Sequence, residues 1–266
     1  MNHSAIRLAA SLTLACLLGL LLPHAGSSEA INAGGLVLDD LKRDYQVRTL
    51  DNQPADAHDR RMYNTISFTY WTEPVMQDGK QLIRFHREEK TKEGYLVNYI
   101  ILFDPVDSRL IQAERKITNA AGQVLSSHFD NYTLAPEIFG KGVLHFNMYP
   151  VVFQQADLSP GAKISLNLAM SAENQPMTIN LEVDGEEPVT VPAGAFQCIR
   201  LKMTFDTNKM LGSQSSLAKI VGYLFPSYIV WIDKTPPHLL IKMQGKFGGL
   251  SSAEQAYELA KVYRDK

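Results

Sequence analysis

Residues 189–205 read Val-Thr-Val-Pro-Ala-Gly-Ala-Phe-Gln-Cys-Ile-Arg-Leu-Lys-Met-Thr-Phe, and this stretch predicts how the rest of the chain is built. Pro192 presets φ and Gly194 tolerates a positive φ, so the stretch favours a tight turn between two strands. From Ile199 to Phe205, apolar residues alternate with polar ones, which is typical of a strand buried on one face. We therefore predict a β-hairpin that turns at Pro192 and Gly194.

The start of the second strand departs from this alternation. Phe196 and Cys198 fall on the opposite phase from Ile199 and the apolar residues that follow it. Two explanations remain open: a β-bulge shifts the register near Cys198, or the first half of the strand is covered on both faces. Because Cys198 lies among apolar neighbours, we expect a buried structural thiol rather than a nucleophile.

An apolar stripe follows the hairpin. Leu217, Ile220, Val221 and Leu224 recur at helical spacing, and Pro226 cannot continue a helix, so the sequence predicts a short helix inserted between two strands. Such a helix could be a lid over the concave face of a sheet, or it could simply complete the core. Under the lid hypothesis the candidate ligand-binding residues are Phe205, Leu217, Ile220, Val221, Leu224, Phe225 and Trp231.

The same region carries a resemblance. The segment Val-Pro-Ala-Gly-Ala-Phe-Gln-Cys, the helical insert, Trp231, and Pro236-Pro237 before Leu-Leu-Ile-Lys resemble an uncharacterised family of exported bacterial proteins. The resemblance extends over residues 62–248, with its strong motifs in the second half. It implies a long antiparallel sheet that curls on itself, similar to the lipoprotein-carrier (Lol-type) half-barrels, and an exported location. Pro192, Gly194, Pro236 and Pro237 are then structural turn residues.

Strand patterns fill most of the remaining sequence. Period-2 alternation predicts successive strands from Thr65 to Tyr132, with turns at residues 77–80, 91–94, 104–108 and 120–122, and two more strands before a turn at Asp184-Gly185. Residues 136–153, rich in glycine and aromatic residues, break the pattern. They are interpreted either as a segment crossing the open face, helical in part, or as a loop on the edge of the core.

Helical patterns are predicted at two places outside the insert. Leu36, Leu38, Leu41 and Tyr45 suggest a short helix in a loosely packed N-terminal arm, and Ser252 with Gln255 could cap a helix running to Tyr263. The predicted fold is therefore mostly β: a curled antiparallel sheet, half-barrel or meander, with a short inserted helix and a C-terminal helix.

The N-terminus predicts export. Arg7 precedes an apolar run from Leu8 to Leu22, which is closed by Pro23 and small residues, the pattern of a cleavable signal peptide. A permanent membrane anchor is the alternative, although the run is shorter than the about 20 residues of a membrane span. Cys16 lies inside the run, which disfavours a lipoprotein. We expect a signal peptide at 1–30, an arm at 31–60 and one β-rich domain at 61–266, located in the periplasm.

Composition excludes some classes of protein. The net charge of −2 and the dispersed Lys and Arg residues give no electrostatic footprint for nucleic acid. The histidines are scattered singly, so we predict no metal site, and phosphate-binding, cofactor and serine-nucleophile motifs are absent from the sequence.

We interpret the chain as a non-catalytic binder of an apolar ligand, such as a lipid or the acyl chain of a lipoprotein, in the concave face of the sheet. An enzyme acting on an envelope polymer is one alternative, because catalytic carboxylates can come from distant strands. An interaction module that docks on an outer-membrane, envelope or secretion partner is another.

Overall fold

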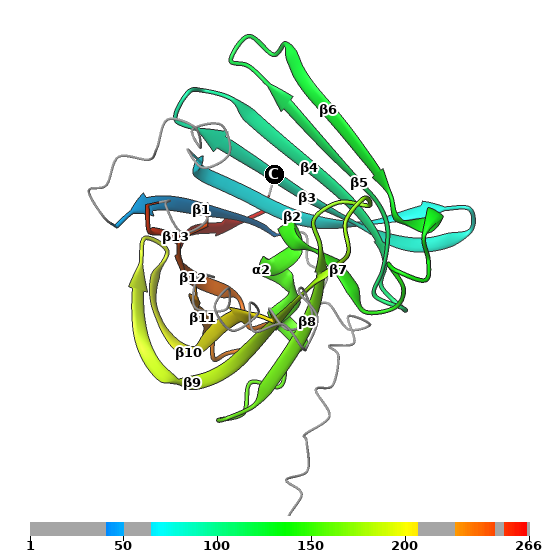
Figure 1. The fold of residues 1–266 in the computed structure, drawn as a ribbon. Helices are drawn as coiled ribbons and strands as arrows, with labels where there is room; N and C mark the ends of the chain where they lie inside the picture. The colour runs from blue at the N-terminus through cyan, green and yellow to red at the C-terminus, as the bar shows by residue number, and fades with distance from the viewer. Residues whose placement is uncertain (1–40, 51–64, 207–226, 248–252, 265–266) are drawn as a thin grey trace, which may run out of the picture.

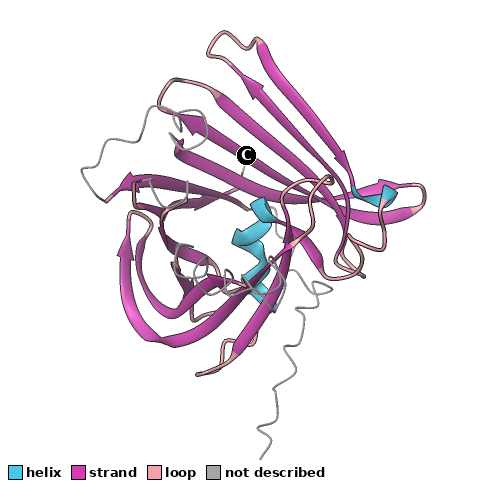
Figure 2. Cartoon of the chain, viewed as in Figure 1, coloured by secondary structure: helices cyan, strands magenta, loops and turns pink. Residues whose placement is uncertain are grey.

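The protein forms one large curled sheet. The computed structural model describes residues 41–50, 65–206, 227–247 and 253–264. Within these ranges a 13-stranded sheet curls around a short helical segment (Figure 1). Strands make up most of the cartoon in Figure 2, and the prediction of a mostly β, curled antiparallel sheet is confirmed.

The strands fall into two groups, separated by a mixed segment. The first strands are β1 (Lys42–Thr49), β2 (Thr65–Gln77), β3 (Lys80–Thr91), β4 (Leu96–Asp104), β5 (Arg109–Thr118) and β6 (Val124–Asn131). The mixed segment follows, with η2 (Tyr132–Leu134), β7 (Val143–His145), η3 (Phe146–Met148), α2 (Tyr149–Val152) and η4 (Phe153–Gln155). The last strands are β8 (Lys163–Ala169), β9 (Met177–Val191), β10 (Gly194–Phe205), β11 (Tyr228–Asp233), β12 (Leu240–Gly245) and β13 (Gln255–Tyr263).

The strand order follows the chain as a meander with one crossover. It runs β6-β5-β4-β3-β2-β1-β13-β12-β11-β10-β9-β8-β7, and the pairs are antiparallel except β7 with β8. The predicted turn at Gln77–Lys80 is confirmed, since Gln77 pairs with Lys80 around Asp78 and Gly79. Asp78 and Gly79 both have positive φ, a conformation that glycine and aspartate tolerate better than most residues.

The segment between β6 and β8 fills the inside of the curl. Figure 1 shows α2 against the concave side of the sheet. The prediction that this segment crosses the open face and is helical in part is confirmed. Its buried side chains join the single hydrophobic core described for the protein: Phe139, Val143, Leu144, Met148, Tyr149, Val151, Val152 and Phe153.

A helix is expected around Leu36–Tyr45, but the part of that range that the structure describes is not helical. Residues Lys42–Thr49 are strand β1, which pairs with β13 on one side and with β2 on the other. Tyr45 is fully buried, and its hydroxyl donates a hydrogen bond to the carbonyl of Leu240, 2.6 Å away. A weak helical spacing is overridden here, because both edges of the segment are paired with neighbouring strands.

The predicted C-terminal helix is wrong. Residues Gln255–Tyr263 form β13, which is paired on both sides, with β1 and with β12. The apolar spacing of Ala256, Leu259, Ala260 and Tyr263 fits a helix, but Tyr257 and Leu259 also fit the inner face of a strand. β1 pairs along the length of β13 and β12 pairs with Gln255–Glu258, and this tertiary pairing overrides local helix propensity.

The predicted turn at Asp184-Gly185 is also wrong. β9 continues through these residues, and its register with β10 shifts between Arg200 and Leu201, where Asp184 is the extra residue. Gly185 takes a φ of 154° next to this bulge. Cys198 and Ile199 are adjacent on β10 and both are buried, while the register with β9 is regular from Gly194 to Arg200. Of the two explanations left open by the sequence, coverage of the strand on both faces is therefore the one that fits.

The two ends of the sheet meet on one side of the molecule. The amide of Gly142, just before β7, donates to the carbonyl of Asp107 at 3.4 Å. The amide of Ala172, after β8, donates to Oδ1 of Asp130 at the end of β6, 2.7 Å away. The ring of Tyr132 also packs edge-on against His145, with centroids 6.3 Å apart. These contacts join one end of the edge strands, while the rest of β6 extends away from the curl (Figure 1).

Candidate functional site

Aromatic rings form a continuous row along the inner face of the sheet. Adjacent rings lie 4.0–6.0 Å apart between centroids, as stacked, tilted or edge-on pairs of the kind that stabilise aromatic clusters. We call this set the aromatic row. Its members, in spatial order, are Phe85, Tyr70, Tyr45, Phe68, Tyr257, Phe247, Tyr228 and Phe205.

The row is assembled from strands far apart in the sequence. Seven of the rings sit on the inward phase of β1, β2, β3, β10, β11 or β13, and Phe247 follows the end of β12. Strand alternation therefore places these seven on one face. The stack of Phe247 on Tyr257, with an interplanar angle of 10°, connects the β12 side to β13. The curl of the sheet therefore brings into contact aromatic rings that lie on different strands.

One end of the row is less buried than the other. Phe85, Tyr70 and Tyr45 are fully buried, whereas Phe205 and Phe247 are only partly buried and pack against the edge of the core. Between the latter two lies Tyr228, whose hydroxyl donates to the carbonyl of Lys246 at 2.9 Å. An apolar ligand that reached the row would therefore meet Phe205 and Phe247 first.

Gly245 makes this end of the row possible. A Cβ at this position would collide with the ring of Tyr228, so only glycine lets the ring lie flat on β12. Tyr228 is thereby placed between Phe205, at 6.0 Å, and Phe247, at 5.1 Å between centroids.

A buried arginine lies beside the fully buried part of the row. The guanidinium carbon of Arg87, on β3, sits 4.1 Å from the ring centroid of Phe68 and 5.0 Å from that of Tyr149 on α2. Nε of Arg87 lies 2.7 Å from Oε1 of Glu89, whose other oxygen accepts a hydrogen bond from Thr65. Burial opposes the charge of Arg87, but Tyr149, Glu89 and other neighbours outweigh it and raise the pKa. The interior thus holds a neutralised ion pair.

His145 is buried as a neutral ring. Its Nδ1 accepts a hydrogen bond from the amide of Asn147 at 3.2 Å, so the proton of the neutral ring is on Nε2. Burial, opposed by nearby Asp130 and assisted by Arg87, lowers the pKa of His145 to about 4. At neutral pH this residue therefore carries no charge into the interior.

Cys198 is a protonated thiol. Its side chain is buried on β10, and its Sγ donates to the carbonyl of Phe196 at 3.9 Å. Burial, together with Asp233 and Glu187, raises the pKa of the thiol to about 12. A thiol held in this state is a small apolar group and a poor nucleophile.

The ligand-binding residues expected from the sequence divide into three groups. Phe205 lies on the inner face, at the partly buried end of the aromatic row. Trp231 lies on the opposite face, because its neighbours Val230 and Ile232 point inward and are fully buried. The third group lies outside the described residues, so the inserted helix and its role as a lid stay predictions. Its members are Leu217, Ile220, Val221, Leu224 and Phe225.

The turn residues are placed as hairpin chemistry suggests. Val191 pairs with Gly194 around Pro192 and Ala193, and Gly194 has a φ of 136°. Pro236 and Pro237 occupy the connection between β11 and β12, with the peptide bond between them in cis.

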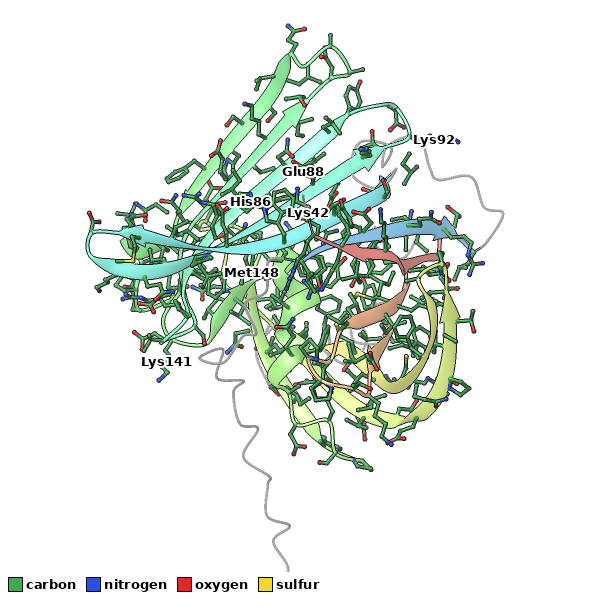
Figure 3. The ribbon with its side chains drawn as sticks, turned by 180° about the vertical axis from the view of Figure 1, so that it is seen from behind. Lys42, His86, Glu88, Lys92, Lys141 and Met148 are labelled. Atoms are coloured by element: carbon green, nitrogen blue, oxygen red, sulfur yellow. The ribbon has the colours of Figure 1, made fainter. Side chains whose placement is uncertain are left out.

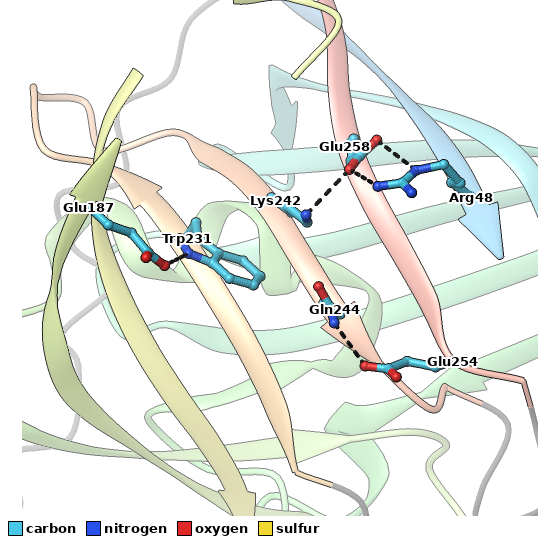
Figure 4. Close-up of polar contacts among 7 residues, drawn as sticks. All are labelled: Arg48, Glu187, Trp231, Lys242, Gln244, Glu254 and Glu258. Atoms are coloured by element: carbon cyan, nitrogen blue, oxygen red, sulfur yellow. Dashed lines mark hydrogen bonds and ion pairs between the residues drawn. The ribbon is translucent and has the colours of Figure 1, made fainter. Parts of the chain in front are cut away.

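The outer face carries a polar network around Trp231 (Figure 4). The indole Nε1 of Trp231 donates to Glu187, and Nζ of Lys242 lies 5.1 Å from the ring centroid. Glu258 pairs with Arg48 at 2.9 Å and with Lys242 at 3.4 Å, and Gln244 donates to Glu254 at 2.9 Å. Such a surface holds water and does not suit an apolar ligand.

A second outer cluster lies on β1, β2 and β3. The rings of Trp71 and His86 stack at 4.6 Å, and Nζ of Lys42 lies 4.4 Å from the Trp71 centroid. His86 and Glu88 project from the outer side of the sheet in Figure 3. Nε2 of His86 lies 3.1 Å from Oε1 of Glu73, which also pairs with Arg84. Both groups of strands therefore carry a polar cluster on the convex face.

Metal-binding clusters and membrane-spanning helices are both absent from the described residues. No group of three or more His, Cys, Asp or Glu side chains capable of holding a metal occurs in the part of the chain that the structure describes. Within the same ranges, no helix has the length and apolar character needed to cross a membrane.

Comparison with protein families identifies the chain. The family model "protein of unknown function (DUF3108)" matches residues 104–251, more than half of the sequence. The chain belongs to the DUF3108 family. No protein with a curated description matches it. The family agrees with the resemblance drawn from residues 189–248, which points to uncharacterised exported bacterial proteins.

Several solved structures match the DUF3108 chain at low sequence identity and low TM-score. A candidate exported protein with a YmcC-like fold from Bacteroides fragilis matches with 11% identity and a TM-score of 0.36, covering 85% of this chain and 96% of its own. A β-barrel-like protein of DUF1849 from Brucella abortus has 11% identity and a TM-score of 0.39, with 84% and 96% covered. The hypothetical lipoprotein YmcC from Escherichia coli has 10% identity and a TM-score of 0.28, with 79% and 90% covered.

Sequence patterns alone revealed only part of the aromatic row. Phe68, Tyr70 and Phe85 were visible as inward residues of strands, but Tyr45 and Tyr257 stood in segments predicted as helices. Arg87 gave no signal, since a single arginine in an alternating strand looks like an exposed residue. The inward phase of its neighbours Ile83 and Phe85 is the one pattern that could have indicated its burial.

Proposed function

We propose that this DUF3108 protein is exported and binds an apolar ligand, such as a lipid or the acyl chain of a lipoprotein, on the concave face of its sheet. The observation that carries the proposal is the aromatic row, which runs from a fully buried end to the partly buried rings of Phe205 and Phe247. Export is supported by the apolar run from Leu8 to Leu22 near the N-terminus.

The chemistry of the concave face favours apolar contacts over charge recognition. The Arg87 guanidinium is neutralised by Glu89, and His145 is uncharged at neutral pH. A second buried arginine, Arg43, lies over the ring of Tyr70, 5.5 Å from its centroid. Aromatic and aliphatic side chains make up most of the remaining core around the row. Burial of an acyl chain against them gains about 25 cal/mol for each Å² of apolar surface removed from water, before ordering costs.

The proposed role is non-catalytic. Cys198, the candidate nucleophile in the sequence, is held as a protonated thiol by its burial. The polar networks of the outer face are satisfied by their own partners, as in the contacts of Trp231 with Glu187 and of Glu258 with Arg48.

The first test measures binding of a fluorescent fatty acid to delipidated protein. Phe205→Ser combined with Phe247→Ser should weaken binding about tenfold, because about 1.4 kcal/mol of ring contact is lost. Trp231→Leu is the matched control, since it removes an aromatic ring of the same sheet from the outer face. The expected affinity of this control is that of the parent protein.

Mass spectrometry of the freshly purified protein supplies the second readout. We expect a co-purifying lipid in the parent protein and in Trp231→Leu, and its loss in the double variant. A parent protein that carries no lipid and does not bind the probe contradicts the proposal. An effect of Trp231→Leu as large as that of the double variant would place binding on the other face.

A further inference from the structure

The two edge strands of the sheet are protected very differently. All residues of β7 are buried, and this strand lies beside the Asp107–Gly142 contact that joins the ends of the sheet. In β6, by contrast, every residue from Val124 to Phe129 is exposed, on both faces of the strand. Within the described residues β6 pairs only with β5. One row of its backbone amide and carbonyl groups therefore faces away from the sheet.

β6 lacks the features that usually prevent edge strands from pairing. Proteins protect such edges with lysine, proline, bulges or covering segments. The strand reads Val-Leu-Ser-Ser-His-Phe-Asp-Asn, without lysine, arginine or proline. Its single register shift, opposite Ile117 and Thr118, affects only the beginning of the strand. From Ser126 to Asn131 the pairing with β5 is regular. Ser126 to Phe129 are exposed along this part, and Asp130 is buried where its Oδ1 accepts the amide of Ala172.

We propose that β6 pairs antiparallel with β6 of a second copy of this chain, around a two-fold axis at Phe129. Two 13-stranded sheets would then join into one continuous sheet. The proposed register sets Phe129 opposite Phe129, His128 opposite Asp130, and Ser127 opposite Asn131. These pairs fall entirely within the regular part of the strand.

The side chains of β6 are complementary to themselves in this register. Phe129 is 56% exposed, and the two-fold axis brings it against its own copy, where aromatic pairs across strands are favourable. His128 of each chain meets Asp130 of the other, so no like charges face each other. Within one chain the same groups already lie 3.3 Å apart, between Nε2 of His128 and Oδ2 of Asp130. A chain with a strongly charged edge would instead repel its own copy.

The size of the contact predicts a weak and reversible dimer. A strand pair of this length covers far less surface than the about 1,600 Å² of a standard stable interface. The dimer should therefore form at high protein concentration and dissociate on dilution.

Disulfide cross-linking tests the register. In Phe129→Cys the two introduced thiols face each other across the axis, within the range of Cβ separations that a disulfide accepts. In Ser127→Cys, the matched control on the same strand, the two thiols lie about 13 Å apart along the strands. Cys16 is replaced by serine in both full-length variants, and Cys198 is too buried to react. We expect an oxidised dimer for F129C and a monomer for S127C.

Sedimentation analysis tests the interface without a cross-link. The parent protein should show a concentration-dependent dimer, which Phe129→Lys should abolish by placing two cations at the axis. Val106→Lys, at a position 74% exposed and outside β6, adds the same charge and should leave the dimer intact. Thermal unfolding of each variant shows that the fold is retained, as expected for exposed positions.

The outcomes decide the proposal. A parent protein that stays monomeric at the highest concentration overturns it. A dimer that survives Phe129→Lys places the interface elsewhere and also overturns it. Cross-linking of S127C as readily as F129C shows that the register is wrong.

Discussion

Two long hairpins of the same sheet have opposite surroundings. The β9–β10 hairpin is paired on both sides and packs its inner face into the core, where Leu201 is fully buried. The β5–β6 hairpin has a free edge, and Leu125 on that edge is 50% exposed. β9 and β10 alternate apolar and polar residues, whereas β6 reads Val-Leu-Ser-Ser-His-Phe-Asp-Asn and does not alternate. The curl covers the inner face of the first hairpin and leaves most of β6 exposed.

The β9–β10 hairpin contributes side chains to the core, whereas the β6 strand of the other hairpin is mostly exposed to solvent. Residues of β10 contact the aromatic row through Phe205 and the core through Leu201 and Met203. In β6, only Asp130 is buried, at the point where it accepts the amide of Ala172. The side chains that stabilise the fold are therefore gathered around α2, and the exposed strand edge lies on β6, away from α2.

The largest expected difference concerns identical substitutions in the two hairpins. Leu201→Ala should lower the free energy of unfolding by about 4 kcal/mol, because it leaves a cavity in a fully buried site. Leu125→Ala, the matched change on β6, should cost less than about 1 kcal/mol, since half of its side chain is already in water. Urea titrations of both variants measure the difference. Equal losses would show that β6 is covered in solution.

A comparison of ion pairs should give the next largest effect. Glu89→Gln leaves the buried Arg87 without a compensating charge and should destabilise the protein by about 3 kcal/mol. Glu182→Gln removes the partner of Lys163 from an exposed pair, which lies 3.7 Å apart, and should cost less than about 0.5 kcal/mol. Chemical unfolding at constant pH checks both values. A small cost for Glu89→Gln would mean that water reaches Arg87.

The pH dependence of the free energy of unfolding should reflect the burial of His145, the last residue of β7. The folded-state pKa of His145, lowered to about 4 by burial, lies below the ordinary value of 6.5. The unfolded chain therefore binds a proton that the folded protein does not bind, and the free energy of unfolding falls by about 3 kcal/mol as the pH drops from 7 to 4. Below that range the folded protein also takes up the proton, and the loss levels off.

His145→Asn provides the control for this prediction. Its side-chain oxygen can still accept the amide of Asn147, while the titrating ring is gone. The decline in unfolding free energy between pH 7 and pH 4.5 should therefore be smaller in this variant than in the parent. If both proteins lose stability in parallel, other groups are responsible for the acid sensitivity.

The sequence predicted the strands that are regular and failed where tertiary pairing decides. The turns at Gln77–Lys80 and Pro192–Gly194 follow from glycine and proline chemistry and lie where expected. Asp184-Gly185 carries the same chemistry, yet β9 continues through it, paired with β10 around a bulge at Asp184. Tyr257 stands in a stretch with good helical spacing, and only the presence of β1 and β12 makes it a strand.

The candidate site was harder to predict than the fold. Phe205 could be found because its strand alternates clearly, and the inward phase of that strand points to the core. Trp231 looked like a ligand contact, but the phase of Val230 and Ile232 places it outside. The aromatic row joins residues from separate strands, and no local spacing encodes which rings meet.

The pairing of β1 with β13 has a consequence for the order in which the sheet folds. These strands are neighbours at the centre of the sheet, and the Tyr263 hydroxyl donates to Asp44 across 219 positions of sequence. Until β13 is available, one edge of β1 has no strand partner. Contacts between such distant segments are slow to form, because a long loop must close first. The centre of the sheet is therefore expected to close late in folding.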